Sequence, residues 1–250
     1  MEVNVALAII LCVLLVVIGR ERGGKTIVSF ACNFGLFFLA NHWLADGKSP
    51  IVVSFLVCVL ASVVVLFLVN GYNQKTVAAF VSVMSVVVIM CVLVYVFVFR
   101  GHLQGYTAEQ ADTLMTYELT LAIDFRLLTV SAVIMSLIGA LIDAAISITS
   151  AVYEVHQNNP QLSKKELMQS GMNMGMDILS TNANTLFFAF IAEEVAFCIW
   201  LKVYQHSFWD MINYKTFARE AITMLLSASG CVLILPIATW VCVQCYTRNK

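Results

Sequence analysis

Charged residues are scarce in this 250-residue sequence. They make up 12% of the chain, whereas hydrophobic residues make up 61%. A soluble domain usually carries charge on about a quarter of its residues. The composition therefore excludes a water-soluble globular protein and predicts an integral membrane protein whose first partner is the lipid bilayer. The net charge of −1 gives no indication of nucleic-acid binding.

Residues that mark flexible linkers are also few. The chain has three prolines and twelve glycines, and no low-complexity tract. We therefore expect one integral membrane domain over residues 1–250. It would comprise four N-terminal spans (1–100), an outer interfacial segment (101–126) and a core of three spans (127–250). No basic region precedes the first apolar run, which predicts a retained first span rather than a cleaved signal peptide.

The eight cysteines do not form a disulfide framework, because all of them lie in or at the edge of apolar runs. We interpret them as small apolar packing residues. Cys242 and Cys245 form a Cys-x-x-Cys pair, but no second pair or histidine accompanies it in the sequence. We therefore predict no metal and no cofactor.

Seven apolar stretches are long enough to cross a bilayer, which takes about 20 residues in a helix. Backbone polar groups cannot stay unpaired in lipid, so each stretch is expected to be helical even where valine is abundant. The predicted fold class is an all-α, polytopic transmembrane helix bundle of about seven spans. The stretches are Val3–Gly19, Thr26–Leu44, Ile51–Val69, Val77–Phe99, Leu127–Val152, about Ser170–Ile191 and Ala221–Tyr246.

Basic residues near the span ends predict which way the bundle faces. With the N-terminus outside, the inner connections hold eight lysines and arginines and the outer ones hold six. The basic cluster at residues 19–25, directly after the first span, favours the same orientation because early helices tend to dominate. We predict an N-out, C-in topology.

The sequence does not decide the structure of two segments at the predicted outer side. Residues 115–125 alternate between apolar and polar, which predicts a short strand or extended segment, with an interfacial helix as the alternative. Glu193 and Glu194 follow the sixth span. They would lie near the outer interface if that helix ends there, and deeper in the protein if it runs on to Leu201.

An aspartate interrupts the fifth span. Asp143 belongs to a set of small and polar residues that recur every three or four positions, which places them on one face of a helix for about five turns. The set is Ser136, Ala140, Asp143, Ser147, Ser150 and Glu154.

A second polar stripe follows on the sixth span. It consists of Ser170, Asn173, Asp177, Ser180 and Asn184, flanked by Thr181 and Thr185, with Gly171 and Gly175 nearby. Between the two spans, residues 156–160 are typical of a turn, and Ser163 with Glu166 fits a capping box. Because the connection is short, we expect antiparallel neighbours whose stripes face each other or share one cavity.

Two interpretations of Asp143 and Asp177 stay open. A carboxylate facing lipid costs about 2.5–3.5 kcal/mol on insertion scales, so ionisable residues at such depth usually face protein or water and often mark an ion path. The functional interpretation makes both aspartates protonation or cation sites on a transport path. The structural interpretation makes them part of a hydrogen-bond network that holds two helices together. The predicted path also includes Ser147, Ser150, Glu154, Asn173, Ser180, Thr181 and Asn184.

A specific residue pattern begins at Gly139 with GALID and continues to the Asn-Thr-Leu at residues 184–186. Its positions are Gly139, Ala140, Asp143, Glu154, Asn159, Pro160, Ser163, Glu166, Leu167, Ser170, Gly171, Gly175, Asp177, Asn184, Thr185 and Leu186. This pattern resembles the YibE/F family of bacterial multi-pass membrane proteins, and INYKTFAREAI and LILPIAT extend the resemblance over Leu127–Thr239. The first four spans fit in length and placement only. The lack of a large soluble insert is similar to the shorter, YibF-like member.

The resemblance has one departure. The family tends to have Tyr-x-Gly after Asn-Thr-Leu, where this chain has IAEEVAF, so Glu193 and Glu194 are this sequence's own. The resemblance implies a protein of the bacterial cytoplasmic membrane that works with a longer YibE-like partner. It implies no particular activity.

We expect a permease or permease subunit, for which the aspartates would allow proton coupling. The first alternative is a non-transporting structural or assembly subunit whose stripes only bind a neighbour. A further alternative is an intramembrane aspartyl hydrolase, because two aspartates on adjacent helices could share a proton. The Tyr-Asp and Gly-x-Gly-Asp motifs of such enzymes are missing, so we predict no enzyme.

Overall fold

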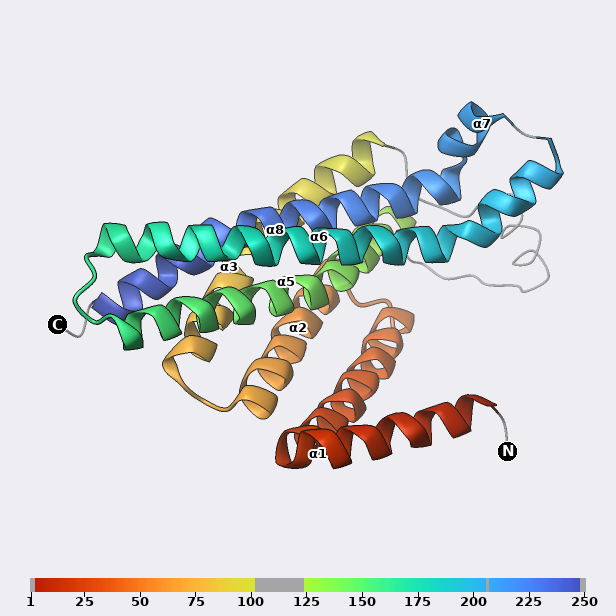
Figure 1. The fold of residues 1–250 in the computed structure, drawn as a ribbon. Helices are drawn as coiled ribbons and strands as arrows, with labels where there is room; N and C mark the ends of the chain where they lie inside the picture. The colour runs from red at the N-terminus through yellow and green to blue at the C-terminus, as the bar shows by residue number, and fades with distance from the viewer. Residues whose placement is uncertain (1–2, 102–123, 206, 248–250) are drawn as a thin grey trace.

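A computed structural model describes residues 3–101, 124–205 and 207–247 of the chain, and every regular element within these ranges is helical (Figure 1). The all-α prediction is therefore confirmed for the described residues. The predicted strand or interfacial helix at 115–125 lies outside them, except for its last two residues, where α5 begins. The elements are α1 (Val3–Ala45), α2 (Pro50–Val63), the π-helical η1 (Val64–Val69), α3 (Gln74–Arg100), α5 (Phe125–Asn158), α6 (Lys164–Val203), α7 (Phe208–Asn213) and α8 (Lys215–Thr247).

The hydrophobic core lies where α3, α5 and α8 meet, with α2 and α6 packed around them. Met90, Leu141 and Ile234 come from the three central helices, and each is fully buried. The core joins spans on both sides of the segment 102–123, so the third and fourth predicted spans are packed together with the C-terminal spans rather than separate from them.

α1 is bent into two limbs. Arg20 has φ 48° and ψ −125°, which breaks the helix at the point where the first predicted span ends. Gly23 then lies against the backbone of Leu15, so closely that a Cβ at this position would collide with the Leu15 carbonyl. A glycine is therefore required where the limbs touch. The two predicted spans are present as the limbs, but the reversal between them takes one residue and no loop.

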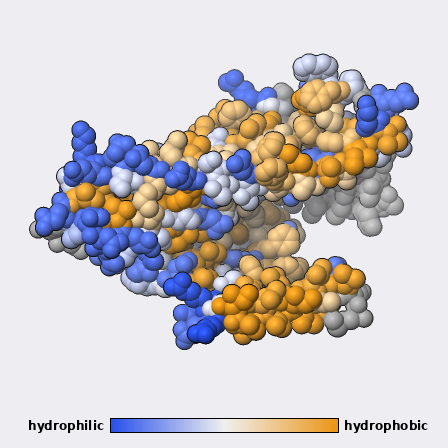
Figure 2. Space-filling view, in the orientation of Figure 1, coloured by the Kyte–Doolittle hydropathy of each residue, from blue (hydrophilic) through white to orange (hydrophobic). Residues whose placement is uncertain are grey.

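Most of α1 has no neighbour in the chain. Its second limb packs against α2 and η1, and only Gly23, Ser29 and Ala40 are buried. Figure 2 shows the first limb as a continuous hydrophobic surface, whereas hydrophilic residues gather at the end of the bundle where the α5–α6 connection and the C-terminal end of α8 lie. An exposed apolar surface of this size fits contact with lipid.

Five helical segments of the described part are long and apolar enough to cross a membrane: α1, α2 with η1, α3, α5 and α8. α6 is 40 residues long but more polar, because it carries the second stripe. The predicted count of seven would require both limbs of α1 and also α6 to cross the membrane, so the number of spans stays a prediction. The connections at 70–73 and 159–163 and the C-terminal end of α8 lie at one end of the bundle in Figure 1, and α7 lies at the other. Which end faces the cytoplasm stays a prediction.

The α5–α6 connection is as short as the sequence indicates. α5 continues to Asn158, so His156 and Gln157 are helical rather than part of the turn. The Ser163–Glu166 capping box is confirmed. The Ser163 hydroxyl and backbone N–H both donate to Glu166 Oε2, at 2.7 and 2.8 Å, and the Glu166 N–H donates to Ser163 Oγ at 3.3 Å.

Candidate functional site

The polar stripe of the fifth predicted span lies on the outward face of α5. Asp143, Ser147 and Glu154 are exposed, and Ser150 is half-buried. The inward face carries Leu141, which packs against Gly230 of α8. The 3.6-residue period therefore separates an apolar side that belongs to the core from a polar side that the chain itself leaves uncovered.

The stripe of α6 is also uncovered. Asn173, Asp177, Ser180, Thr181 and Asn184 are all exposed. The Thr181 hydroxyl donates to the Asp177 carbonyl oxygen at 3.2 Å, and Gln169 Nε2 donates to Asn173 Oδ1 at 3.1 Å. Both bonds stay within α6, so they do not tie this helix to α5.

α6 packs on the bundle through its glycines. A Cβ on Gly171 would lie 2.6 Å from Thr239 Cγ2 and 2.7 Å from Val152 Cγ2, and a Cβ on Gly175 would collide with Leu235 Cδ1. The two glycines therefore let α6 settle into the groove between α5 and α8, as small residues do at membrane-helix interfaces. The sequence contained this signal as a Gly-x-x-x-Gly.

The expectation that the two stripes face each other or share one cavity is wrong for the isolated chain. Asp177 lies two residues beyond Gly175, about 160° around α6 from that contact. Asp143 lies five residues before Ile148, which faces Gly175, and is about 140° around α5 from it. Each aspartate is thus directed away from the other helix. They do not form the carboxylate pair that an aspartyl hydrolase requires.

The two aspartates nevertheless lie at similar depth. Val152 is opposite Gly171 and Ile148 is opposite Gly175, so α5 and α6 are antiparallel with a fixed register. Extending that register places Asp143 about level with position 180, within one turn of Asp177. Two carboxylates therefore sit at one depth on the surface of the chain, far from either end of their helices.

The sequence profile described as YibE/F-like protein matches residues 7–248. The chain belongs to the YibE/F-like family. The match includes the first four spans, which the sequence pattern had related to the family in length and placement only. Comparisons with curated proteins and with solved structures gave no match.

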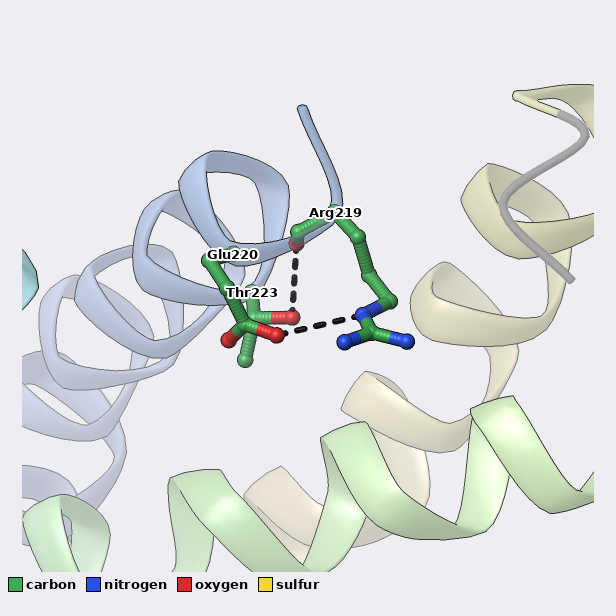
Figure 3. A network of polar contacts seen from close by, with 3 residues as sticks. All are labelled: Arg219, Glu220 and Thr223. Atoms are coloured by element: carbon green, nitrogen blue, oxygen red, sulfur yellow. Dashed lines mark hydrogen bonds and ion pairs between the residues drawn. The ribbon is translucent and has the colours of Figure 1, made fainter. Parts of the chain in front are cut away.

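This YibE/F-like protein has a second polar group, at the end of α6 near α7. Arg219 Nε donates to Glu220 Oε1 at 3.1 Å, and the Thr223 hydroxyl donates to the Arg219 carbonyl oxygen at 2.9 Å (Figure 3). Glu194 of α6 lies within electrostatic range of this pair and is buried. Sequence reasoning singled out Glu194 and included Arg219 and Glu220 in the segment INYKTFAREAI, but it did not relate them to Glu194. Nothing in their local pattern indicates that α8 brings them beside α6.

Other features of the YibE/F-like protein lie apart from the stripes. Within the described ranges no three histidine, cysteine or acidic residues are grouped closely enough to hold a metal ion. A groove of about 320 Å³ lies beside the connection between α1 and α2, where the Lys48 ammonium is 5.0 Å from the centre of the Trp43 ring. A lysine over an aromatic ring is typical of a membrane–water interface.

Proposed function

We propose that this YibE/F-like membrane protein is a permease subunit of the bacterial cytoplasmic membrane, and that a second membrane protein completes its polar stripes. The observation that carries the proposal is the exposure of Asp143 and Asp177 at one depth of the bundle. A charge exposed to hydrocarbon costs about 2.5–3.5 kcal/mol, so these faces need cover by protein or water. The longer YibE-like protein is the proposed partner.

The path would then run along the interface with the partner rather than through this chain. Asp143 and Ser147 on α5, and Asp177 and Ser180 on α6, would supply oxygen ligands to a proton or small cation that passes between the proteins. Carboxylates are among the groups that line such intramembrane relays. Proton coupling is part of the proposal because an aspartate can take up and release a proton.

A second candidate is a non-transporting assembly subunit, whose stripes only bind the partner through hydrogen bonds. The two stripes do not face each other between α5 and α6, and this observation supports the assembly subunit as much as the permease subunit. The two candidates differ in whether the carboxylates are needed for flux or only for binding. The proposal includes no enzymatic activity.

The test uses the tagged full-length chain purified with its partner from native membranes and reconstituted in vesicles. Asp143→Asn and Asp177→Asn keep the size and most hydrogen bonds of each side chain but remove the charge. We expect both variants to co-purify with the partner and to lose pH-driven flux. Asp46→Asn is the matched control, because Asp46 is an exposed carboxylate outside the stripes.

Flux that is unchanged in both stripe variants, at normal complex levels, would leave only the assembly subunit. A chain that purifies without any partner, and is stable alone in lipid, would remove the basis of both candidates.

A further inference from the structure

The inference concerns the interface between the outer part of α6 and the start of α8. Phe190, Glu194, Phe197 and Leu201 recur at spacings of 4, 3 and 4 and so share one face of α6. The ring of Phe190 is 5.4 Å from that of Phe217, and the ring of Phe197 is 5.0 Å from that of Tyr214. These aromatic contacts lie about one helical turn before and one turn after Glu194 on the same face of α6.

Glu194 is buried in this apolar interface with an unsatisfied oxygen. Its exposed fraction is 6%, and its Oε2 atom has no hydrogen-bond partner among the described residues. Glu193, the adjacent residue, is exposed. The two glutamates therefore differ sharply in surroundings, and only Glu194 is directed toward α8.

The nearby cation does not neutralise Glu194. The Arg219 guanidinium is already paired with Glu220, as Figure 3 shows. The charges that act most on Glu194 are those of Glu220 and Arg219 from α8 and of Glu193 from α6 itself. The Cys198 thiol, one turn further along α6, is also in range. Glu194 thus has two like charges and one guanidinium within electrostatic range, and that guanidinium is hydrogen-bonded to Glu220.

The group lies toward the α7 end of the bundle, which is the outer end in the predicted N-out topology, rather than at its middle. The register that joins Gly175 to Ile148 and to Leu235 places Glu194 about level with Thr129 of α5 and Thr216 of α8. Arg126 and Lys215, basic residues typical of a membrane interface, are within three residues of these positions. We therefore expect this depth to be close to the membrane–water interface, although the Glu194 side chain itself is covered.

We propose that Glu194, beside the Arg219–Glu220 pair, is a proton-binding site at the outer end of α6 and α8. An ionised carboxylate buried without a partner is strongly disfavoured and takes up a proton instead. Glu220 is the like charge that promotes protonation, and Arg219 is the opposite charge that resists it. The site binds its proton whether or not the protein transports anything, so it is independent of the function proposed above.

The test is an infrared pH titration of the full-length chain in lipid nanodiscs, which follows the carbonyl band of protonated carboxylic acids. Glu194→Gln is isosteric, and the difference between wild type and this variant isolates the Glu194 band. We expect one Glu194 band, which disappears as the pH rises. The matched control, Glu193→Gln, should retain this band.

Two further variants test the electrostatic account in the wild-type Glu194 background, so they remain informative if Glu194→Gln folds poorly. We expect Glu220→Gln to move the midpoint of the Glu194 band to lower pH, because a like charge is lost and Arg219 is released. Arg219→Gln is expected to move it to higher pH.

Midpoints that move in the same direction in both variants would overturn the proposal. So would the absence of a titrating band specific to Glu194, or its loss in Glu193→Gln. A midpoint pH that shifts with the sodium or potassium concentration would also overturn it, since the site would then bind an alkali cation. Absence of flux in vesicles would refute the permease subunit and leave this band unchanged.

Discussion

α1 and α6 are both peripheral helices, and each leaves most of its surface uncovered by the rest of the chain. Along the two limbs of α1, away from the polar residues at the bend and at the end of the helix, the uncovered residues are mainly valine, leucine, isoleucine and phenylalanine, which lipid can cover at no cost. Those of α6 include Asn173, Asp177 and Asn184, which lipid cannot cover without a penalty. The comparison teaches that exposure within one chain has two meanings in a membrane protein. Lipid can cover the surface of α1, and we propose that a further protein covers that of α6.

The largest expected effect concerns how α6 is held. Gly171→Leu together with Gly175→Leu would force side chains into Thr239, Val152 and Leu235, at about 1–3 kcal/mol for each overpacked position. We expect α6 to leave its groove and the double variant to lose most of its monodisperse, folded protein in detergent. Size-exclusion chromatography and thermal unfolding measure this. Gly139→Leu is the control, because no atom lies within 4 Å of a Cβ there. Equal losses in the control would mean that the glycines do not hold α6.

Exchanging the two kinds of surface tests the comparison directly. Leu11→Asp places a charge on the exposed apolar face of α1 and should weaken membrane insertion by about 2.5–3.5 kcal/mol. Asp177→Leu makes the α6 face apolar and should not weaken insertion, but should abolish co-purification with the partner. The inserted fraction is measured with a topology reporter fused to each variant. Similar insertion losses in both variants would contradict the distinction between α1 and α6.

The bend in α1 is the next test. Gly23→Ala places a methyl group against the Leu15 carbonyl, and we expect the limbs to separate at a cost of about 1–3 kcal/mol. Cys12 and Cys32 are exposed, one on each limb. With the other six cysteines replaced, spin labels at these two report the limb separation. Gly24→Ala is the control, since its Cβ would meet nothing within 4 Å. A distance distribution that does not change in Gly23→Ala would show that the contact does not set the bend.

The smallest expected effect is at the start of α6. Ser163→Ala removes the cap and should cost about 1 kcal/mol. Hydrogen bonds from the Ser163 hydroxyl and backbone N–H hold the pKa of Glu166 below its usual value. A lowered pKa in the folded state means that this stabilisation is present above the unfolded pKa and is lost as the pH falls through the folded one. Ser163→Ala should therefore lose less stability on acidification than the wild type.

Chemical unfolding at a series of pH values measures the effect. Asn73→Ala is the matched control, because the Asn73–Thr76 capping box of α3 contains no carboxylate. If Asn73→Ala showed the same change in the pH dependence of stability, the change in Ser163→Ala could not be attributed to Glu166.

The sequence predicted the spans well because lipid imposes a simple rule on length and hydropathy. Ile51–Val69 was predicted, and Pro50–Val69 is helical. The bend at Arg20 was not predictable, because it depends on the contact between Leu15 and Gly23, which lie eight residues apart on different limbs. The sequence left open whether α6 ends near Ile191 or continues. It continues to Val203, because the last part of the helix packs on α8.

The site was predictable in part, for a related reason. Residue spacing shows which side chains share a helix face, and both stripes were found that way. Spacing does not show where a face is directed, since that depends on how the neighbouring helices fit. Here Gly171 and Gly175 decide the rotation of α6 and turn Asp177 outward. The approach of Glu194 to Arg219 and Glu220 joins residues 25 and 26 positions apart, which only the tertiary structure reveals.

The reversal at Arg20 also determines how the N-terminal part is made. Since the first limb meets the second at Leu15 and Gly23, its partner surface does not exist until the second limb has left the ribosome. We therefore expect both limbs to enter the bilayer together as one hairpin, with Arg20, Arg22 and Lys25 at its tip. In the predicted N-out topology those three cations would lie on the side of synthesis, and the hairpin tip would set the direction in which the remaining helices cross the membrane.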